Sequence, residues 1–417
     1  MTETAAGGST TGSGEPPITN GTPAGGDLRI AGPFGVMIGS FVLLGAPIAA
    51  LGVAWPSMAA DFDRSLGSLG VLSVSFGVGY AASTVAAGSV AHLLSVERRL
   101  AIATILAVGS LLGFATTSSW SGLVVAAIAL GVAGGQIDAA VNAHVALHDD
   151  VSAMGYIHGS FGIGVALAPL LIVGLAALGA SWRVGFAVLA AAQCVIAVAF
   201  IVLARHARSR SPIAESVRPR WSPLGRRLMI VSILAFGAYG GLAAGTGQWA
   251  YTVLTQDLGV ADGVAGVAVA GYWAGFTSSR LMLGLAGRRF DIQQIPGVAT
   301  AVTLLCLVIF WIGPGSPIAV AGLVVSGFAH GPFFPVQTLF APRRFGAALA
   351  PAAVGYQIAA ANLGAAVVPG VIGVAVEAFG LGSVRPMLVA TAVVVVVLTE
   401  ALRRASPVAT VGTARAK

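Results

Sequence analysis

Residues 153–172 read AMGYIHGSFGIGVALAPLLI, and residues 353–372 read AVGYQIAAANLGAAVVPGVI. The shared positions keep a constant offset of 200 residues, and in the first copy they are Ala153, Gly155, Tyr156, Gly164, Ala166, Pro169 and Ile172. An upstream block recurs at an offset of 196 residues, where Gly88, Gly131 and Gly135 become Gly284, Gly327 and Gly331. Two matched halves in an apolar chain predict a membrane transporter in which one half moves against the other.

The composition excludes a soluble protein. Hydrophobic residues make up 57% of the chain and charged residues only 9%, whereas soluble domains carry about 25% charged residues. Apolar runs long enough to cross a bilayer follow one another along the sequence. We predict twelve spans, at about residues 31–55, 67–94, 99–118, 120–147, 154–178, 184–204, 227–252, 263–286, 293–313, 317–341, 350–378 and 384–402.

The arginines predict the orientation. Most of them fall at one set of predicted helix ends or in the middle loop, namely Arg98, Arg99, Arg205, Arg208, Arg210, Arg218, Arg220, Arg226, Arg227, Arg288, Arg289, Arg343, Arg344, Arg403 and Arg404. Only Arg64, Arg183 and Arg385 fall on the other side. This positive-inside pattern predicts a multi-pass protein of the cytoplasmic (inner) membrane with both termini in the cytoplasm. Basic loops beside anionic lipid explain the formal charge of +7, so no nucleic-acid partner is expected.

The predicted domains follow from the same pattern. Residues 1–30 form a disordered cytoplasmic tail, residues 31–204 the first six-helix half, and residues 205–226 a cytoplasmic linker. Residues 227–404 form the second half, and residues 405–417 a second tail. Each half begins and ends inside, so the repeat is parallel. The predicted fold class is an all-α membrane protein with twelve transmembrane helices in two parallel six-helix pseudo-repeats, and we expect a monomer.

Asp138 is the strongest candidate for function. It lies deep in the fourth predicted span, and Asn142 follows one turn later on the same helix face. Acids within a span are costly and mark ion and proton pathways, and a carboxyl in a low-dielectric cavity can take up a proton near neutral pH. We predict Asp138 as a proton-coupling residue, with Gln136 and Asn142 contacting substrate. The alternative is an acid held by a neighbouring helix to fix packing.

The other polar residues within spans form two groups. His158 is a second candidate for proton coupling, because histidine titrates near neutrality. Amides and an imidazole suit hydroxyl groups of a substrate, although they are also common interhelical hydrogen-bonding groups. The predicted substrate contacts in this group are Gln248, His330, Gln337, Gln357 and Asn362.

For several charged and aromatic residues we predict a structural role. Arg280 lies within the eighth span, and we predict a structural or gating role, either reaching toward the cytoplasmic surface or pairing with an acid. The same role is predicted for Arg98, Arg99, Asp149 and Asp150. The large aromatic residues of the seventh and eighth spans are predicted in the membrane–water interface, with stacking on a sugar as the alternative; they are Trp249, Tyr251, Tyr272 and Trp273.

The sequence lacks the motifs of an enzyme. Its only lysine is Lys417, so no P-loop for ATP is present. No H-E-x-x-H, G-x-S-x-G or Cys/His metal spacing occurs either. We therefore predict no catalysis, cofactor or metal, and transport that is driven by a gradient.

The whole pattern resembles the major facilitator superfamily. The family's loop signature after the second span is matched in part by Gly88, His92 and Glu97-Arg98-Arg99. Within the superfamily, the fourth span resembles the fucose/galactose/gluconate proton symporters through Asp138 and Asn142. Ser279-Arg280 followed by Gly284, and Phe161-Gly162, are similar to elements of that group. The resemblance implies that Asp138 couples protons and helps to bind sugar hydroxyls. The group's acid in the first span has no counterpart here.

We therefore predict a permease that moves a small polar solute, such as a sugar, together with protons by alternating access. The predicted cavity lies between the halves and is lined by the first, fourth, seventh and tenth spans. A proton-coupled efflux antiporter for drugs or metabolites is the first alternative, which the uncharged first span favours. A membrane sensor that does not transport is the second. The expected partners are a small-molecule substrate, protons and the lipid bilayer.

Overall fold

The computed structural model describes residues 33–90, 93–146, 151–206, 222–286, 291–313, 316–346 and 349–405. The predicted N-terminal tail, residues 207–221 of the predicted linker, and residues 406–417 lie outside these ranges. The described ranges contain helices and short connections and no β-strand.

The first half consists of six long helices. They are α1 (Pro33–Asp61), α2 (Leu69–Val90), α3 (Val96–Thr116), α4 (Trp120–Ala146), α5 (Val151–Ala177) and α6 (Trp182–His206). A 3₁₀ turn, η1 (Leu66–Ser68), precedes α2. Each predicted span of this half coincides with one of these helices.

The second half repeats the plan with one break. Its helices are α7 (Pro223–Thr252), the π-helical turn η2 (Val253–Asp257), α8 (Asp262–Ala286), α9 (Ile295–Ile312), α10 (Ser316–His330), α11 (Phe333–Leu339), the short α12 (Ala341–Phe345), α13 (Ala350–Phe379), the 3₁₀ turn η4 (Leu381–Ser383) and α14 (Val384–Ala405). The tenth predicted span is divided into α10 and α11 at Gly331-Pro332. Proline lacks the N–H for a helical hydrogen bond and clashes with the preceding turn, which explains the break.

Helix starts are set by local capping. The Ser95 hydroxyl accepts a hydrogen bond from the backbone N–H of Arg98 at the start of α3. The Ser222 hydroxyl accepts one from Gly225 at the start of α7, where Pro223 occupies the first turn. These side chains satisfy N–H groups that have no partner within the helix.

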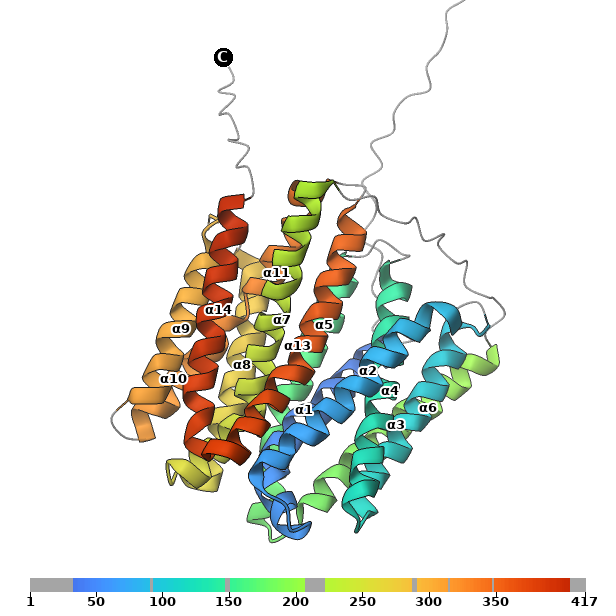
Figure 1. Ribbon diagram of the computed structural model, residues 1–417. Coiled ribbons are helices and arrows are strands. Elements are labelled where there is room, and N and C mark those ends of the chain that lie inside the picture. The colour runs from blue at the N-terminus through green and yellow to red at the C-terminus, as the bar shows by residue number, and fades with distance from the viewer. Residues whose placement is uncertain are drawn as a thin grey trace, which may run out of the picture.

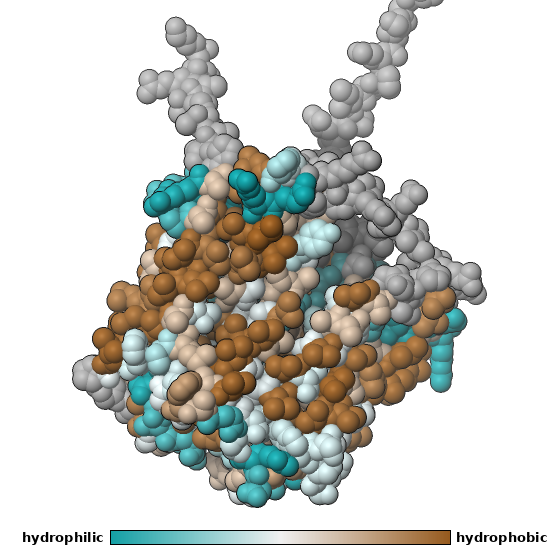
Figure 2. Space-filling model, viewed as in Figure 1, coloured by the Kyte–Doolittle hydropathy of each residue, from teal (hydrophilic) through white to brown (hydrophobic). Residues whose placement is uncertain are grey.

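The surface has the pattern of a membrane protein. Eleven helical segments of the described residues are long and apolar enough to span a bilayer. The eighth predicted span, α8, is not among these eleven segments, and it carries Thr277, Ser278, Ser279 and Arg280. Figure 2 shows a broad hydrophobic band across the face in view, with hydrophilic residues gathered toward the top and bottom. The prediction of an all-α membrane protein built of two six-helix halves is confirmed.

The sequence repeat appears as repeated packing. A Cβ atom at Gly131 of α4 would collide with the carbonyl oxygen of Phe76 in α2. At the offset of 196 residues, a Cβ atom at Gly327 of α10 would collide with the carbonyl oxygen of Tyr272 in α8. The matched glycines therefore allow the α2–α4 and α8–α10 backbones to approach closely in the same way.

The most extensive contacts between the halves join α1 with α7, α2 and the turn η1 with α13, and α5 with α8. We call the end of the molecule where α7 begins and α14 ends the linker end, which is at the top of Figure 1, and the opposite end the far end. The halves converge toward the far end and diverge toward the linker end (Figure 1). At the far end Gly70 of α2 packs against Gly370 of α13, and the Ser65 hydroxyl donates to Glu377.

Candidate functional site

A cavity of about 230 Å³ lies between the halves. All four spans predicted to line it contribute: Phe41 of α1, Asp138 of α4, Gln248 of α7 and Phe334 of α11. The cavity is also lined by α2, α5, α8 and α13, and by one residue each of α3 (Phe114) and α6 (Phe186), none of which the sequence prediction included. Of these helices, α2, α5, α8 and α13 also pack across the boundary between the halves.

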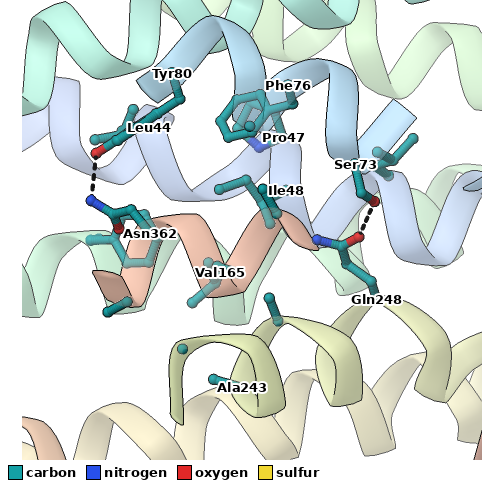
Figure 3. A pocket seen from close by; sticks show the side chains of 18 of the residues that line it. Leu44, Pro47, Ile48, Ser73, Phe76, Tyr80, Val165, Ala243, Gln248 and Asn362 are labelled. Carbon is teal, nitrogen blue, oxygen red and sulfur yellow. Dashed lines mark hydrogen bonds between the residues drawn. The ribbon is translucent and has the colours of Figure 1, made fainter. Parts of the chain in front are cut away.

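Most of the cavity wall is apolar. Figure 3 shows Leu44, Pro47 and Ile48 of α1 facing Val165 of α5 and Ala243 of α7. Aromatic rings complete the wall, and they are those of Phe41, Phe76, Phe114, Phe161, Phe186, Trp273, Phe276 and Phe334. Such a wall favours a solute with a substantial apolar surface, because burying that surface is what stabilises binding.

Asp138 belongs to a chain of hydrogen bonds that links the halves. The Tyr80 hydroxyl of α2 donates to Asp138 Oδ2 (2.6 Å), and Asn142 Nδ2 donates to Asp138 Oδ1 (2.7 Å). On the other side, Asn362 Nδ2 of α13 donates to the Tyr80 hydroxyl (3.4 Å), as Figure 3 shows. The Tyr80 hydroxyl therefore bridges the carboxyl group of the first half and Asn362 of the second half.

A second hydrogen bond between the halves lies nearer the far end. The Ser73 hydroxyl of α2 donates to Gln248 Oε1 of α7 (2.5 Å), and both residues line the cavity (Figure 3). Close by, a Cβ atom at Gly52 of α1 would collide with the backbone of Gln248. The cavity is thus closed toward the far end by direct contact of α1 and α2 with α7.

Arg280 lines the cavity from the second half. Its Nε donates to the carbonyl oxygen of Gly331 (3.1 Å) and its Nη2 to the Tyr239 hydroxyl (2.9 Å). The guanidinium lies over the ring of Phe276, 4.1 Å from the centroid, and 5.6 Å from that of Phe334. These contacts direct the charge into the bundle instead of toward the membrane surface.

His158 and Asp138 lie at a similar depth. His158 of α5, Asp138 of α4 and Arg280 of α8 all lie about two turns from the linker end of their helices. All three line the cavity. The His158 ring makes an edge contact with Phe41, with centroids 6.0 Å apart. The charged and titratable side chains therefore gather in the part of the cavity nearest the linker end.

The remaining predicted contacts lie outside the cavity wall. Gln136 donates to the carbonyl oxygen of Ser83 (2.6 Å) and accepts from Arg99 (3.4 Å), and so joins α4 to α2 and α3. Asn142 contacts Asp138 but does not itself line the cavity. Their positions indicate packing and support of Asp138.

In the second half, too, most of the predicted substrate contacts lie outside the cavity wall. His330 is 2% exposed and donates from Nε2 to the carbonyl oxygen of Tyr239 (3.1 Å), with its ring stacked on that of Tyr239. Gln357 donates to the Ser232 hydroxyl (2.7 Å). Gln337 is buried. Of the predicted amides, only Gln248 and Asn362 line the cavity.

The other predicted gating residues lie in different environments. Arg99 is buried beside Gln136, and Arg98 is exposed at the start of α3. Asp149 and Asp150 lie outside the described residues. Within the described ranges, no group of three or more His, Cys, Asp or Glu side chains could hold a metal ion.

Sequence reasoning missed Tyr80, Tyr239 and Ser73. Tyr80 is a tyrosine in the middle of a predicted span, away from the interface where aromatic residues normally gather, and this position was a usable signal. The interface prediction for Trp249 and Tyr272 is wrong, because both side chains are buried. Their polar atoms donate to the carbonyl oxygens of Pro369 and Ala243.

Two six-helix halves around a central cavity define a membrane transporter and not an enzyme. The family model described as Major Facilitator Superfamily matches residues 37–254, and the chain belongs to this superfamily. No curated protein matches the chain.

Solved structures of transporters share the fold. The nucleoside transporter NupG is 18% identical, with a TM-score of 0.69, over 89% of this chain and 98% of that one. A bacterial homologue of the human lysosomal transporter Spinster, inward-facing and occupied, is 16% identical, with a TM-score of 0.70, over 89% and 96%. The peptide transporter POT in complex with sulfate is 12% identical, with a TM-score of 0.70, over 89% and 95%. At these identities the likeness concerns the fold alone.

Proposed function

We propose that this protein is a proton-coupled secondary transporter of the cytoplasmic membrane and that Asp138 accepts the proton. The observation that carries the proposal is the chain from Asp138 through Tyr80 to Asn362. It joins an acid in the cavity wall to the opposite half of the molecule. Ionisable groups at membrane depth are costly and are typical of proton pathways.

The hydrogen bonds suggest how protonation would act on the halves. The ionised carboxylate accepts from both Tyr80 and Asn142. Once protonated, the carboxyl group carries an O–H donor of its own. It has also lost its negative charge, so it accepts a weaker hydrogen bond from the Tyr80 hydroxyl. Tyr80 is then free to leave Asn362, which weakens one contact between the halves. Proton uptake and movement of the halves are coupled by this exchange of partners.

The orientation proposed from the arginines puts the linker end in the cytoplasm. Contacts at the far end, between α1 and α7 and between Gly70 and Gly370, would then close the outer side. The cavity would be in its inward-facing state, and alternating access would require these contacts to separate.

We propose a small organic solute with a polar group as the substrate. Asn362, Gln248, His158 and the carboxyl of Asp138 supply polar groups in the wall. A sugar would need several polar groups for its hydroxyls, but most of the predicted amides lie outside the cavity wall. The wall therefore supports a sugar less well than a solute with a single polar group. Gln248 and Asn362 are each already bonded across the boundary between the halves.

A proton-coupled efflux antiporter for drugs or metabolites is the second candidate. The apolar wall favours it, since hydrophobic and amphiphilic compounds bind by burying apolar surface. Helix α1 carries no acidic residue before its last residue, Asp61. The lack of an acid within the first span also favours the antiporter.

Proton movement in liposomes tests the proposal and separates the candidates. The purified protein is reconstituted with the pH dye pyranine inside, and D-galactose, gluconate or 4-phenylbutyrate is added outside. Protein-free liposomes give the baseline. A symporter acidifies the lumen as solute enters, and an antiporter makes it alkaline.

The Asp138→Asn variant is expected to lose proton movement by at least about tenfold, while solute exchange between the two sides persists. Asp63→Asn is the matched control, because Asp63 is an exposed residue with a φ of 51° that asparagine also adopts. Proton movement in Asp138→Asn equal to that of the parent protein would remove Asp138 from the coupling role.

A further inference from the structure

Arg280 carries a positive charge that no acid balances in the described part of the chain. The ion pairs found there join Arg385 to Asp257, and Arg403 and Arg404 to Glu400. A guanidinium stays charged in proteins, and an uncompensated charge at membrane depth is costly. Its position in the cavity wall therefore requires an explanation.

Neutral groups hold Arg280 in place. Two of its five N–H groups donate to Gly331 and Tyr239, and the rings of Phe276 and Phe334 accept the charge on their faces. The other three N–H groups have no partner among the described residues. The guanidinium is thus fixed in direction, with donors left for a ligand.

The sequence repeat shows that the two halves differ at this place. At the offset of 196 residues, Tyr80 and Asp138 correspond to Phe276 and Phe334. The phenol and carboxyl pair of the first half is replaced by two phenyl rings, and these rings hold a cation. The cavity is therefore acidic on one side and basic on the other, with no ion pair between Asp138 and Arg280.

We propose that Arg280 binds the anionic group of the transported solute, which is a small organic anion with an apolar body. A guanidinium recognises a carboxylate through two parallel hydrogen bonds. The apolar wall receives the rest of the molecule, and the volume of about 230 Å³ limits it to a small solute. The inference rests on the proposed transport function and names the substrate class of that site.

The charges also link the anion to the proton. The titratable side chains in the wall are Tyr80, Asp138, His158, Tyr239 and Arg280. An ionised Asp138 repels an anion bound at Arg280, and a protonated Asp138 does not. The anion and the proton therefore strengthen each other's binding, which predicts that they move in the same direction.

Binding in detergent, without any gradient, tests the inference. The probes are three acids, phenylacetate, 4-phenylbutyrate and octanoate, and their neutral amides. Calorimetry and thermal shift of the purified full chain measure the affinity for each. At least one acid is expected to bind about tenfold or more tightly than its amide, as for a charge-assisted hydrogen bond.

Arg280→Gln is expected to reduce this preference to less than about twofold, and Arg280→Lys to keep part of it. Arg404→Gln removes an exposed charge on α14 and should keep the full preference. Asp138→Asn should bind the acid at least as tightly as the parent. The lysine variant, and the melting temperature without ligand, exclude a folding defect as the cause.

The inference is overturned if no acid of the series binds, if amides bind as tightly as acids, or if Arg280→Gln keeps the preference. A failure of the proposed transport function looks different. It appears as a lack of proton movement in liposomes while acids still bind in detergent.

Discussion

At the scale of single residues, the same side-chain type plays different parts according to where its helix places it. Gln248 and Gln136 are both amides within predicted spans. Gln248 lines the cavity and bonds across the halves to Ser73, whereas Gln136 bonds within the first half to Ser83 and Arg99. Sequence alone gives the depth of an amide in the membrane but not the neighbour that it meets.

Gln136→Leu tests the structural role of this amide. The change leaves the carbonyl oxygen of Ser83 and the buried Arg99 without their partner. We expect a loss of about 1–3 kcal/mol in the free energy of unfolding, the cost of an unsatisfied buried polar group, measured by thermal melting in detergent. The solute concentration for half-maximal transport should be unchanged in the folded fraction. A weakened solute affinity at unchanged stability would contradict this assignment.

At the scale of helices, close backbone packing positions the site. The Phe76 carbonyl group in α2 contacts Gly131 of α4. Tyr80, one turn further along α2, reaches Asp138, which lies about two turns further along α4. The approach of α2 to α4 therefore sets the distance of this hydrogen bond. In the second half the equivalent helices, α8 and α10, bring Arg280 to the Gly331 carbonyl group where α10 ends.

Gly131→Ala is expected to push α2 and α4 apart. The added Cβ atom meets backbone atoms that cannot rotate away, and overpacking of this kind costs about 1–3 kcal/mol. Gly327→Ala in the second half should have a similar effect. The control is Gly109→Ala in α3, where a Cβ atom meets nothing within 4 Å and alanine favours the helix. Thermal melting in detergent ranks the three variants, and equal melting temperatures for Gly131→Ala and Gly109→Ala would refute the packing argument.

At the scale of the whole molecule, the fold was largely predictable and the site only in part. Two features of the sequence predict the two halves: the recurrence of Gly131 and Gly135 as Gly327 and Gly331, and the length of the apolar runs. Both can be recognised without knowing which helices contact each other. The bonds from Tyr80 to Asn362 and from Ser73 to Gln248 join residues far apart in the sequence. They depend on how the halves dock, which single-chain periodicity does not encode. The tenth predicted span is one continuous segment, and its division into α10 and α11 at Pro332 needed the structure.

The docking of the halves predicts how the conformational equilibrium responds to Ser73→Ala. The Ser73–Gln248 hydrogen bond lies between the halves toward the far end, where the halves must separate for the cavity to open at that end. A net hydrogen bond contributes about 0.5–1.5 kcal/mol, so its loss should raise the population open at the far end by about two- to twelvefold. Cysteine accessibility measures this population. The reporter is Leu51→Cys in the cavity wall, with Cys194 and Cys306 replaced by serine and an impermeant maleimide added on the far side.

Ser110→Ala provides the control for this measurement. Ser110 is a buried serine whose hydroxyl donates only within its own helix, to the carbonyl oxygen of Leu106 in α3. Its removal should leave the labelling rate of Leu51→Cys unchanged, because α3 lies away from the contact between the halves. A faster rate in Ser73→Ala alone identifies the hydrogen bond to Gln248 as part of the closure at the far end. An equal rate in both variants means that the close packing of Gly52 on Gln248 and of Gly70 on Gly370 closes that end without it.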